Sequence, residues 1–174
     1  MLIRRERATD IDAIAAVHRS AFANETPPGA TEPVEVALVA ALRASDAWIP
    51  ALSLVAEGAD GRVVGHVCLT RGTVGERPAL ALGPIGVAAD TQGGGVGSAL
   101  MHAGLGGADA LGEPLVALLG HLDYYPRFGF VPAADLSIDP GVPDWVSHFQ
   151  VRALDAWTPE LRGEFRYPRA FYAL

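Results

Sequence analysis

Apolar residues in the first part of the chain recur with the period of a helix. Ile11, Ile14 and Val17 carry this spacing directly after a threonine and an aspartate, residue types that cap helices. The pattern predicts a helix over residues 10–22. After a loop that contains two prolines and a glycine, a second apolar face predicts a helix over residues 33–43.

The pattern then changes to the alternation and the short apolar runs of strands. Strands are predicted at 52–56, 62–70, 80–87 and 115–119, with turns at 58–61 and 72–78 and further strand-like pieces near Phe130 and at 151–154. A glycine-rich segment at 89–98 leads into a helical pattern that reaches residue 111. Glycine weakens a helix interior, so a kink or an early end of this helix is expected from its glycines, Gly104, Gly106 and Gly107.

This order of elements predicts an α+β fold. The strands between residues 52 and 87 form a meander and call for antiparallel pairing, whereas the strand–helix–strand unit over 80–119 calls for a parallel crossover. We expect a three-layer arrangement, with a mixed, mostly antiparallel central sheet and helices on both faces. No internal repeat or linker divides the chain, which predicts a single domain over 1–174.

Composition narrows the class of protein. The 174 residues are half apolar and carry a formal net charge of −7, which argues against disorder and against a nucleic-acid partner. The chain contains no run of about 18 apolar residues, so no membrane span is predicted. The single cysteine, Cys68, forms no internal disulfide and suits a small core residue in a reducing, cytoplasmic protein.

The strongest chemical motif is the glycine-rich segment from Asp90 to Ser98, between an apolar strand and a helix. Its glycines let the backbone approach a ligand, and the first turn of a helix offers unpaired N–H donors to phosphate. The P-loop pattern fails because the chain has no lysine. The dinucleotide pattern G-x-G-x-x-G/A fails in every register.

The segment does contain Q-x-x-G-x-G, as Gln92, Gly95 and Gly97, which resembles the coenzyme A diphosphate loop of the GNAT superfamily of N-acetyltransferases. About thirty residues later, Y-x-x-x-G-F stands as Tyr125, Gly129 and Phe130, where this superfamily has a similar signature. The resemblance covers about residues 1–135, and the run from His121 to Phe130 also resembles a poorly characterised bacterial branch of this superfamily.

The resemblance implies a fold in which acetyl-CoA lies between two splayed parallel strands, here 80–87 and 115–119. It implies transfer of an acetyl group to a primary amine of a small molecule or peptide, without a metal. Tyr125 and the backbone of ten neighbouring positions become candidate cofactor-binding residues. Those positions are Ile85, Gly86 and Val87 for the pantetheine arm, and Gln92, Gly93, Gly94, Gly95, Val96, Gly97 and Ser98 for the diphosphate.

The resemblance also implies catalytic roles. The N–H of Val87 is the expected oxyanion donor, and Tyr125 is the expected general acid, with Tyr124 as the alternative. His121 is a candidate general base because imidazole titrates near neutral pH. Other candidates for the base are a water chain and three carboxylates, those of Asp123, Glu25 and Glu76. His66, in the middle of a strand, is expected to be structural.

Residues 136–174 match no pattern and are expected to shape the acceptor site or a homodimer interface. Trp145, Trp157, Phe149 and Tyr167 could line an acceptor pocket or pack in the core. Two other functions stay open: a coenzyme A-binding module without catalysis, and a metal-dependent glyoxalase-type enzyme, whose signature also resembles Y-x-x-x-G-F. The length of the acyl group is open too.

Overall fold

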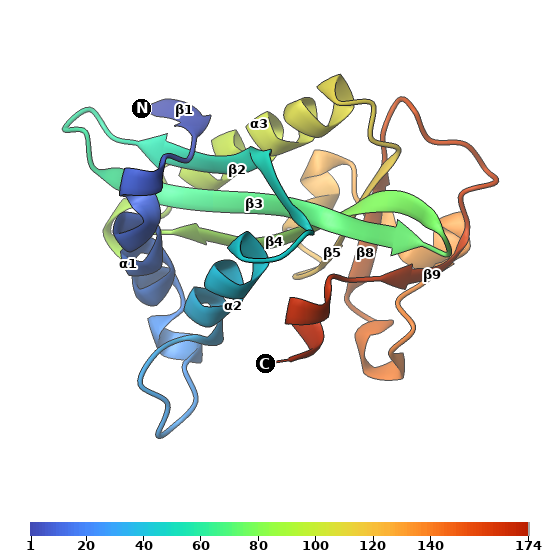
Figure 1. Ribbon diagram of the computed structural model, residues 1–174, viewed down its shortest axis with the longest axis horizontal. Coiled ribbons are helices and arrows are strands. Elements are labelled where there is room, and N and C mark those ends of the chain that lie inside the picture. The colour runs from blue at the N-terminus through green and yellow to red at the C-terminus, as the bar shows by residue number, and fades with distance from the viewer. Residues whose placement is uncertain (174) are drawn as a thin grey trace.

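The computed structural model describes residues 1–173, and its main sheet has the strand order β1-β2-β3-β4-β5-β8-β6 (Figure 1). Strand β9 pairs with the end of β3 and with β7. The strands are β1 (Leu2–Arg5), β2 (Trp48–Glu57), β3 (Val63–Val74), β4 (Arg77–Val87), β5 (Leu115–Leu119), β6 (Val131–Pro132), β7 (Ile138–Asp139), β8 (Phe149–Ala153) and β9 (Gly163–Arg166). The α-helices are α1 (Ile11–Ala21), α2 (Val34–Arg43) and α3 (Val96–Ala110).

Strands β4 and β5 form the one parallel pair of neighbours along this order within residues 1–173. They are joined only at Leu80–Val116 and Ala81–Ala117, so the rest of β4 toward Val87 has no partner on that side. Strand β5, in contrast, pairs along its whole length with β8. The two strands therefore part, which confirms both the parallel crossover and the splayed pair expected of this fold.

The sheet separates two groups of helices. Successive residues of β2 alternate between two cores: Leu52 and Leu54 pack with Leu100 of α3, whereas Val55 packs with Val17 of α1. Figure 1 shows α3 on one side of the strands and α1 and α2 on the other. This confirms the expected α+β fold with a mixed, mostly antiparallel sheet and helices on both faces.

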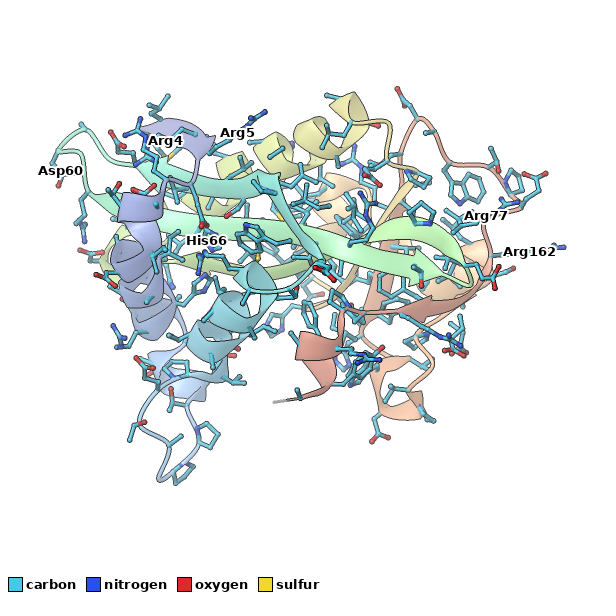
Figure 2. All side chains as sticks on the ribbon, in the orientation of Figure 1. Arg4, Arg5, Asp60, His66, Arg77 and Arg162 are labelled. Atoms are coloured by element: carbon cyan, nitrogen blue, oxygen red, sulfur yellow. The ribbon has the colours of Figure 1, made fainter. Side chains whose placement is uncertain are left out.

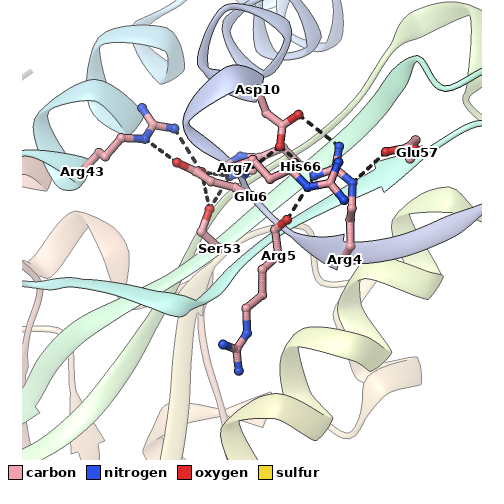
Figure 3. Close-up of polar contacts among 9 residues, drawn as sticks. All are labelled: Arg4, Arg5, Glu6, Arg7, Asp10, Arg43, Ser53, Glu57 and His66. Carbon is pink, nitrogen blue, oxygen red and sulfur yellow. Dashed lines mark hydrogen bonds and ion pairs between the residues drawn. The ribbon is translucent and has the colours of Figure 1, made fainter.

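A chain of polar side chains ties α1 and α2 to the sheet (Figure 3). Glu6, between β1 and α1, accepts hydrogen bonds from Arg43 at 2.6 Å and from the hydroxyl of Ser53. Nε2 of His66 lies 3.0 Å from Oγ of Ser53, and Nδ1 of His66 lies 2.8 Å from Nε2 of His18. One network thus fixes α1 and α2 against β2 and β3.

Both imidazoles of this network are neutral at pH 7. Burial lowers the pKa of His66 and lowers that of His18 to about 3. Burial acts against the Glu6 carboxylate, but hydrogen bonds from His66, Arg43 and Ser53 outweigh it and lower the pKa of Glu6 to about 2. His18 Nε2–H therefore donates to His66, whose own Nε2–H points toward Glu6. His66 has the structural role expected of it.

Strand β1 is a short edge strand that the apolar pattern does not predict. Its Arg4 side chain bonds Asp10 at 2.7 and 3.0 Å and Glu57 at 2.7 Å. These ion pairs join β1 to the start of α1 and to the end of β2, as Figure 3 shows. These polar contacts hold this edge together with Ile3, which packs against the hydrophobic core.

The hairpin between β3 and β4 is tighter than predicted. Strand β3 continues to Val74 and β4 begins at Arg77, so the expectation of a turn over 72–78 is wrong. A Cβ on Gly72 would stand 2.8 Å from Cζ of Phe165 and 2.9 Å from the carbonyl oxygen of Arg166. Gly72 therefore lies within a strand and allows β9 to pass close beside it.

Helix α3 runs without a break to Ala110, so the predicted early end is wrong. A Cβ on Gly104 would stand 3.0 Å from Leu69, and one on Gly107 would stand 3.1 Å from Leu52. These glycines let the helix lie close on the sheet, and packing compensates for their low helix propensity. Within residues 1–173, no helix combines the length and the apolar character that crossing a bilayer requires.

Candidate active site

A cleft of about 600 Å³ opens where β4 parts from β5. It is formed by the end of β4, the glycine-rich loop, the first turn of α3 and the short helix η4 (Tyr125–Phe128). Every residue expected to bind the cofactor lines this cleft except Gly94. Those residues are Ile85, Gly86, Val87, Gln92, Gly93, Gly95, Val96, Gly97, Ser98 and Tyr125.

The open edge of β4 presents backbone groups to this cleft. The N–H of Ala88 donates to the carbonyl of Val64 on β3 at 2.9 Å, one step beyond the Gly65–Val87 pair. Bonded and non-bonded pairs alternate along an antiparallel ladder. The N–H and C=O of Val87, and those of Ile85, therefore point away from β3 and toward the gap beside β5.

The same alternation directs the N–H and C=O of Gly86 toward β3. Because Gly86 has no side chain, residues of α1 can pack closely against it. A Cβ on Gly86 would stand 2.9 Å from Nδ1 of His18 and 3.3 Å from Cβ of Ala21. The buried polar network therefore ends directly behind the wall of the cleft. Unlike Ile85 and Val87, Gly86 does not offer its backbone hydrogen bonds to the gap.

The glycine loop has the shape of an anion cradle. Gly93 and Gly95 have φ values of +77° and +83°, a region that glycine adopts readily. No atom among residues 1–173 lies within 4 Å of a Cβ built on either glycine, so there is open space beside the loop. Gly95 precedes α3, and no side chain caps the first turn of that helix. Its N–H groups can therefore bind an anion.

Tyr124, the residue before the second motif, lies at the start of α3, and Arg127 packs on its ring. A Cβ on Gly97 would stand 3.0 Å from the hydroxyl oxygen of Tyr124. The guanidinium carbon of Arg127 lies 4.7 Å from the ring centroid of Tyr124, and Arg127 also lines the cleft. This brings a positive charge to the wall of the cleft, which the sequence analysis did not predict because the arginine is not a fixed position of the motif.

The geometry distinguishes the two adjacent tyrosines. Tyr124 lines only the first cleft, whereas Tyr125 also lines a second cleft of about 320 Å³. Burial, with a smaller effect of Tyr124, raises the pKa of Tyr125 to about 12, so its hydroxyl keeps its proton at pH 7. Tyr125 is therefore a protonated phenol at the junction of the two clefts.

The second cleft lies between α2 and the C-terminal part of the chain. It shares Phe22, Glu25, Ile85, His121 and Tyr125 with the first cleft. Its other walls come from α2, from the ends of β4 and β5, and from the last residues described. They include Glu35, Leu38, Leu82, Pro84, Leu119, Tyr167 and Phe171. Phe22, Glu35 and Phe171 carry no sequence motif, and long-range packing alone brings them here.

The candidates for the general base differ in whether they line the clefts. Exposed His121 and Glu25 line both clefts, whereas Asp123 and Glu76 line neither. Glu76 precedes Arg77 in the β3–β4 turn, and Figure 2 shows Arg77 at the far end of the molecule from Asp60. Glu76 precedes the first residue of β4, whereas the first cleft lies at the other end of that strand, at Ile85, Gly86 and Val87, so Glu76 is remote from it.

The other residues singled out from the sequence have mostly structural surroundings. Cys68 is fully buried, its thiol donates to the carbonyl of Gly83, and burial raises its pKa. Phe149 is buried, and Trp145 and Trp157 pack against the same apolar cluster. Of the four aromatic candidates for the acceptor site, only Tyr167 lines a cleft.

Comparison with known proteins assigns this architecture. The acetyltransferase (GNAT) domain family matches residues 2–133. The uncharacterised N-acetyltransferase YjhQ of Escherichia coli is 41% identical over 113 residues, which are 63% of this chain and 60% of YjhQ. The chain thus spans less than two thirds of that relative. The uncharacterised N-acetyltransferase YhbS of E. coli is 33% identical over 88% of this chain and 87% of YhbS.

Two solved structures agree with this assignment. The crystal structure of E. coli YhbS in complex with CoA has a TM-score of 0.87 and 29% identity, covering 99% of this chain and 92% of that chain. A GNAT acetyltransferase from Brucella melitensis in complex with acetyl-CoA has a TM-score of 0.76 and 34% identity, covering 98% and 97%. Family and fold remove the glyoxalase-type alternative, and the chain belongs to the GNAT family of acetyltransferases.

Proposed function

We propose that the protein transfers an acetyl group from acetyl-CoA to a primary amine by direct attack in a ternary complex. The position of Tyr125 carries this proposal, because it lines both clefts. A donor in the first cleft and an acceptor in the second would meet at this one hydroxyl. The acetyl-CoA and CoA complexes of the two structural relatives support the choice of donor.

The residues of the first cleft fit the parts of acetyl-CoA, which supplies an acetyl thioester. Ile85 offers backbone hydrogen bonds to an amide arm, because its N–H and C=O face the gap, whereas the carbonyl of Val87 already accepts a hydrogen bond from Gln92 at 3.1 Å. The loop from Gln92 to Ser98 offers N–H donors and open space to a diphosphate. The guanidinium of Arg127 adds a positive charge near the same place.

Three groups of this chain perform the proposed chemistry. His121, which reaches both clefts, takes a proton from the acceptor ammonium and leaves a neutral amine. The amine forms the new C–N bond while the N–H of Val87 donates to the oxygen on which negative charge develops. As the C–S bond breaks, Tyr125 gives its proton to the sulfur, and the second proton that the nitrogen loses on becoming an amide returns to the tyrosine oxygen. The products are the amide, free CoA and one proton.

The test combines binding with turnover. Calorimetric titration with acetyl-CoA, CoA and NADPH should show micromolar binding of the first two and none of NADPH. Release of the CoA thiol is then followed with a panel of amines. Binding followed by amine-dependent release supports the proposal, whereas binding without turnover of any amine would leave a coenzyme A-binding module. Failure to bind either coenzyme would overturn the proposal altogether.

A further inference from the structure

The second cleft has its own chemical character, and it suggests the class of acceptor. It adjoins the first cleft at Tyr125 and has a volume of about 320 Å³. That volume is at the lower end of the range for small-molecule sites. A small molecule bound here would present one end to the hydroxyl of Tyr125.

The charged side chains of this cleft are acidic. Glu25, at the end of the short helix η2 (Ala23–Glu25), and Glu35, in the first turn of α2, both line it, and no arginine does. Within residues 1–173, neither carboxylate has a salt-bridge partner. Burial, together with the charge of Glu25, raises the pKa of Glu35. The two carboxylates thus lack a protein cation and can be compensated by a cationic ligand.

A buried hydroxyl provides an independent observation. Tyr167 lines the cleft and is only 6% exposed, and its hydroxyl oxygen has no hydrogen-bond partner within the part of the chain that the structure describes. Buried polar groups without partners are uncommon in native proteins. The Tyr167 hydroxyl thus adds a third polar group without a described protein partner to the wall that holds the carboxylates of Glu25 and Glu35.

The remaining walls are apolar and partly aromatic. They come from the end of α1, from α2, from β4 and β5 and from the short helix η7 (Arg169–Tyr172). The side chains are Phe22, Leu38, Leu82, Pro84, Leu119 and Phe171. Aromatic faces also attract cations. The cleft therefore combines an apolar body site with acceptors for one cationic end.

We propose that the acceptor is a small primary amine with an apolar, preferably aromatic, body and no anionic group. This inference rests on the proposed acetyl transfer and names its substrate class. An amino acid would bring its carboxylate beside Glu25 and Glu35 without a cation to receive it, a like-charge arrangement that disfavours binding. A polyamine would place further charges against apolar walls.

The experiment compares two acceptors that differ by one carboxylate. Initial rates of CoA release are measured at saturating acetyl-CoA with 2-phenylethylamine and with phenylalanine, and with spermidine as a polar amine. The expected kcat/KM for 2-phenylethylamine exceeds that for phenylalanine by about 100-fold. Equal rates for the two, or a preference for spermidine, would overturn this inference and leave acetyl transfer standing.

Variants test whether the two carboxylates cause the preference. Glu25→Gln and Glu35→Gln should each raise the KM for 2-phenylethylamine, and the double variant should reduce the preference over phenylalanine. Glu32→Gln is the control, because Glu32 lies near α2, pairs with Arg19 and lines neither cleft. A loss of folded protein would lower both rates together and leave their ratio unchanged. An unchanged ratio of the two kcat/KM values in a folded double variant would overturn the inference.

A binding measurement separates this inference from the proposed function. Calorimetric titration of 2-phenylethylamine into the protein saturated with CoA should show binding that Glu35→Gln weakens. If the amine binds in this way but neither it nor any other amine of the panel is acetylated, the proposed function fails and the amine site stands. If acetyl transfer occurs to other amines while 2-phenylethylamine does not bind, the amine site fails and the function stands.

Discussion

The ring of Tyr125 lies directly over the α-carbon of Gly120. A Cβ on residue 120 would stand 2.1 Å from Cε2 of the tyrosine, far inside van der Waals contact. Gly120 immediately follows β5, the strand that parts from β4. The end of the splayed strand therefore sets the position of the phenol at the junction of the two clefts.

Gly120→Ala is expected to lower kcat by about 100-fold, because a displacement of the catalytic group by about 1 Å has an effect of this size. The measurement is CoA release at saturating substrates. In a Tyr125→Phe background the same alanine should cause almost no further loss, since the phenol is already absent. Fully additive losses would show that Gly120 acts through another part of the site.

The two tyrosines are expected to affect different kinetic constants. Tyr125→Phe should lower kcat by roughly 10²- to 10⁴-fold, the range for loss of a general acid. Tyr124→Phe should mainly raise the KM for acetyl-CoA, because its hydroxyl lies near Gly97 at the start of α3. Wild-type turnover in Tyr125→Phe would show that Tyr125 is not the general acid.

His121→Gln is expected to lower kcat most strongly near neutral pH. At high pH the acceptor amine is already largely neutral, so less depends on a protein base and the variant should approach the wild type. A pH profile of kcat between 6.5 and 9.5 checks this. Glu25→Gln serves as the comparison, and if it alone changes the profile, the base is Glu25 rather than His121.

Gly97→Ala is expected to weaken binding of CoA by about 10-fold. The new methyl group would stand 3.0 Å from the hydroxyl of Tyr124 and would disturb the first turn of α3. Calorimetric titration with CoA measures the effect. Gly106→Ala is the matched control in the same helix, because a Cβ there meets no atom within 4 Å; it should stabilise the fold by about 1 kcal/mol. Equal affinities for CoA in the two variants would contradict the assignment of Gly97 to the coenzyme-binding site.

The buried histidines predict a loss of stability in mild acid. Burial lowers the pKa of His18 to about 3 and also lowers that of His66, so the unfolded chain binds protons below about pH 6.5 that the folded chain does not. As the pH is lowered below this value, the free energy of unfolding therefore decreases by about 1 kcal/mol per pH unit for each such histidine. Below about pH 4.5, the lowered pKa of Glu6 adds a loss of the same sign.

Urea unfolding between pH 5 and 8 measures this slope. His18→Phe should reduce the slope between pH 5 and 6.5 by about one proton, and it should also destabilise the fold by about 1–3 kcal/mol because Nδ1 of His66 loses its donor. His148→Gln, at an exposed histidine, should leave the slope unchanged. A wild-type stability that is constant from pH 8 to 5 would contradict the neutral, buried state of these imidazoles.

Local pattern predicted the elements that are apolar and continuous. The run over 115–119 coincides with β5, and the periodic segments coincide with α1 and α2 to within one residue at each end. Residues of both motifs also line one cleft. These features depend on residues that are close together in the sequence, so they can be predicted from it.

Features that depend on distant contacts were not predicted. Gly72 has the composition of a turn, yet it lies within a strand because β9, from nearly 100 residues away, passes beside it. Strand β9 itself has only Phe165 as a buried residue, so it carries no alternating pattern. The same limit hides Glu35 and Phe171, which reach the second cleft only through the packing of α2 against η7.

The second cleft, unlike the first, includes residues beyond the part of the chain that the family model matches. The family match ends at residue 133 and includes the whole glycine loop, whereas Tyr167 and Phe171 come from the segment after β9. Substitutions in that late segment can reshape the wall of the second cleft while the earlier half stays constant. Exchanging this segment between relatives would therefore change part of the wall of the second cleft and leave every residue that lines the first cleft in place.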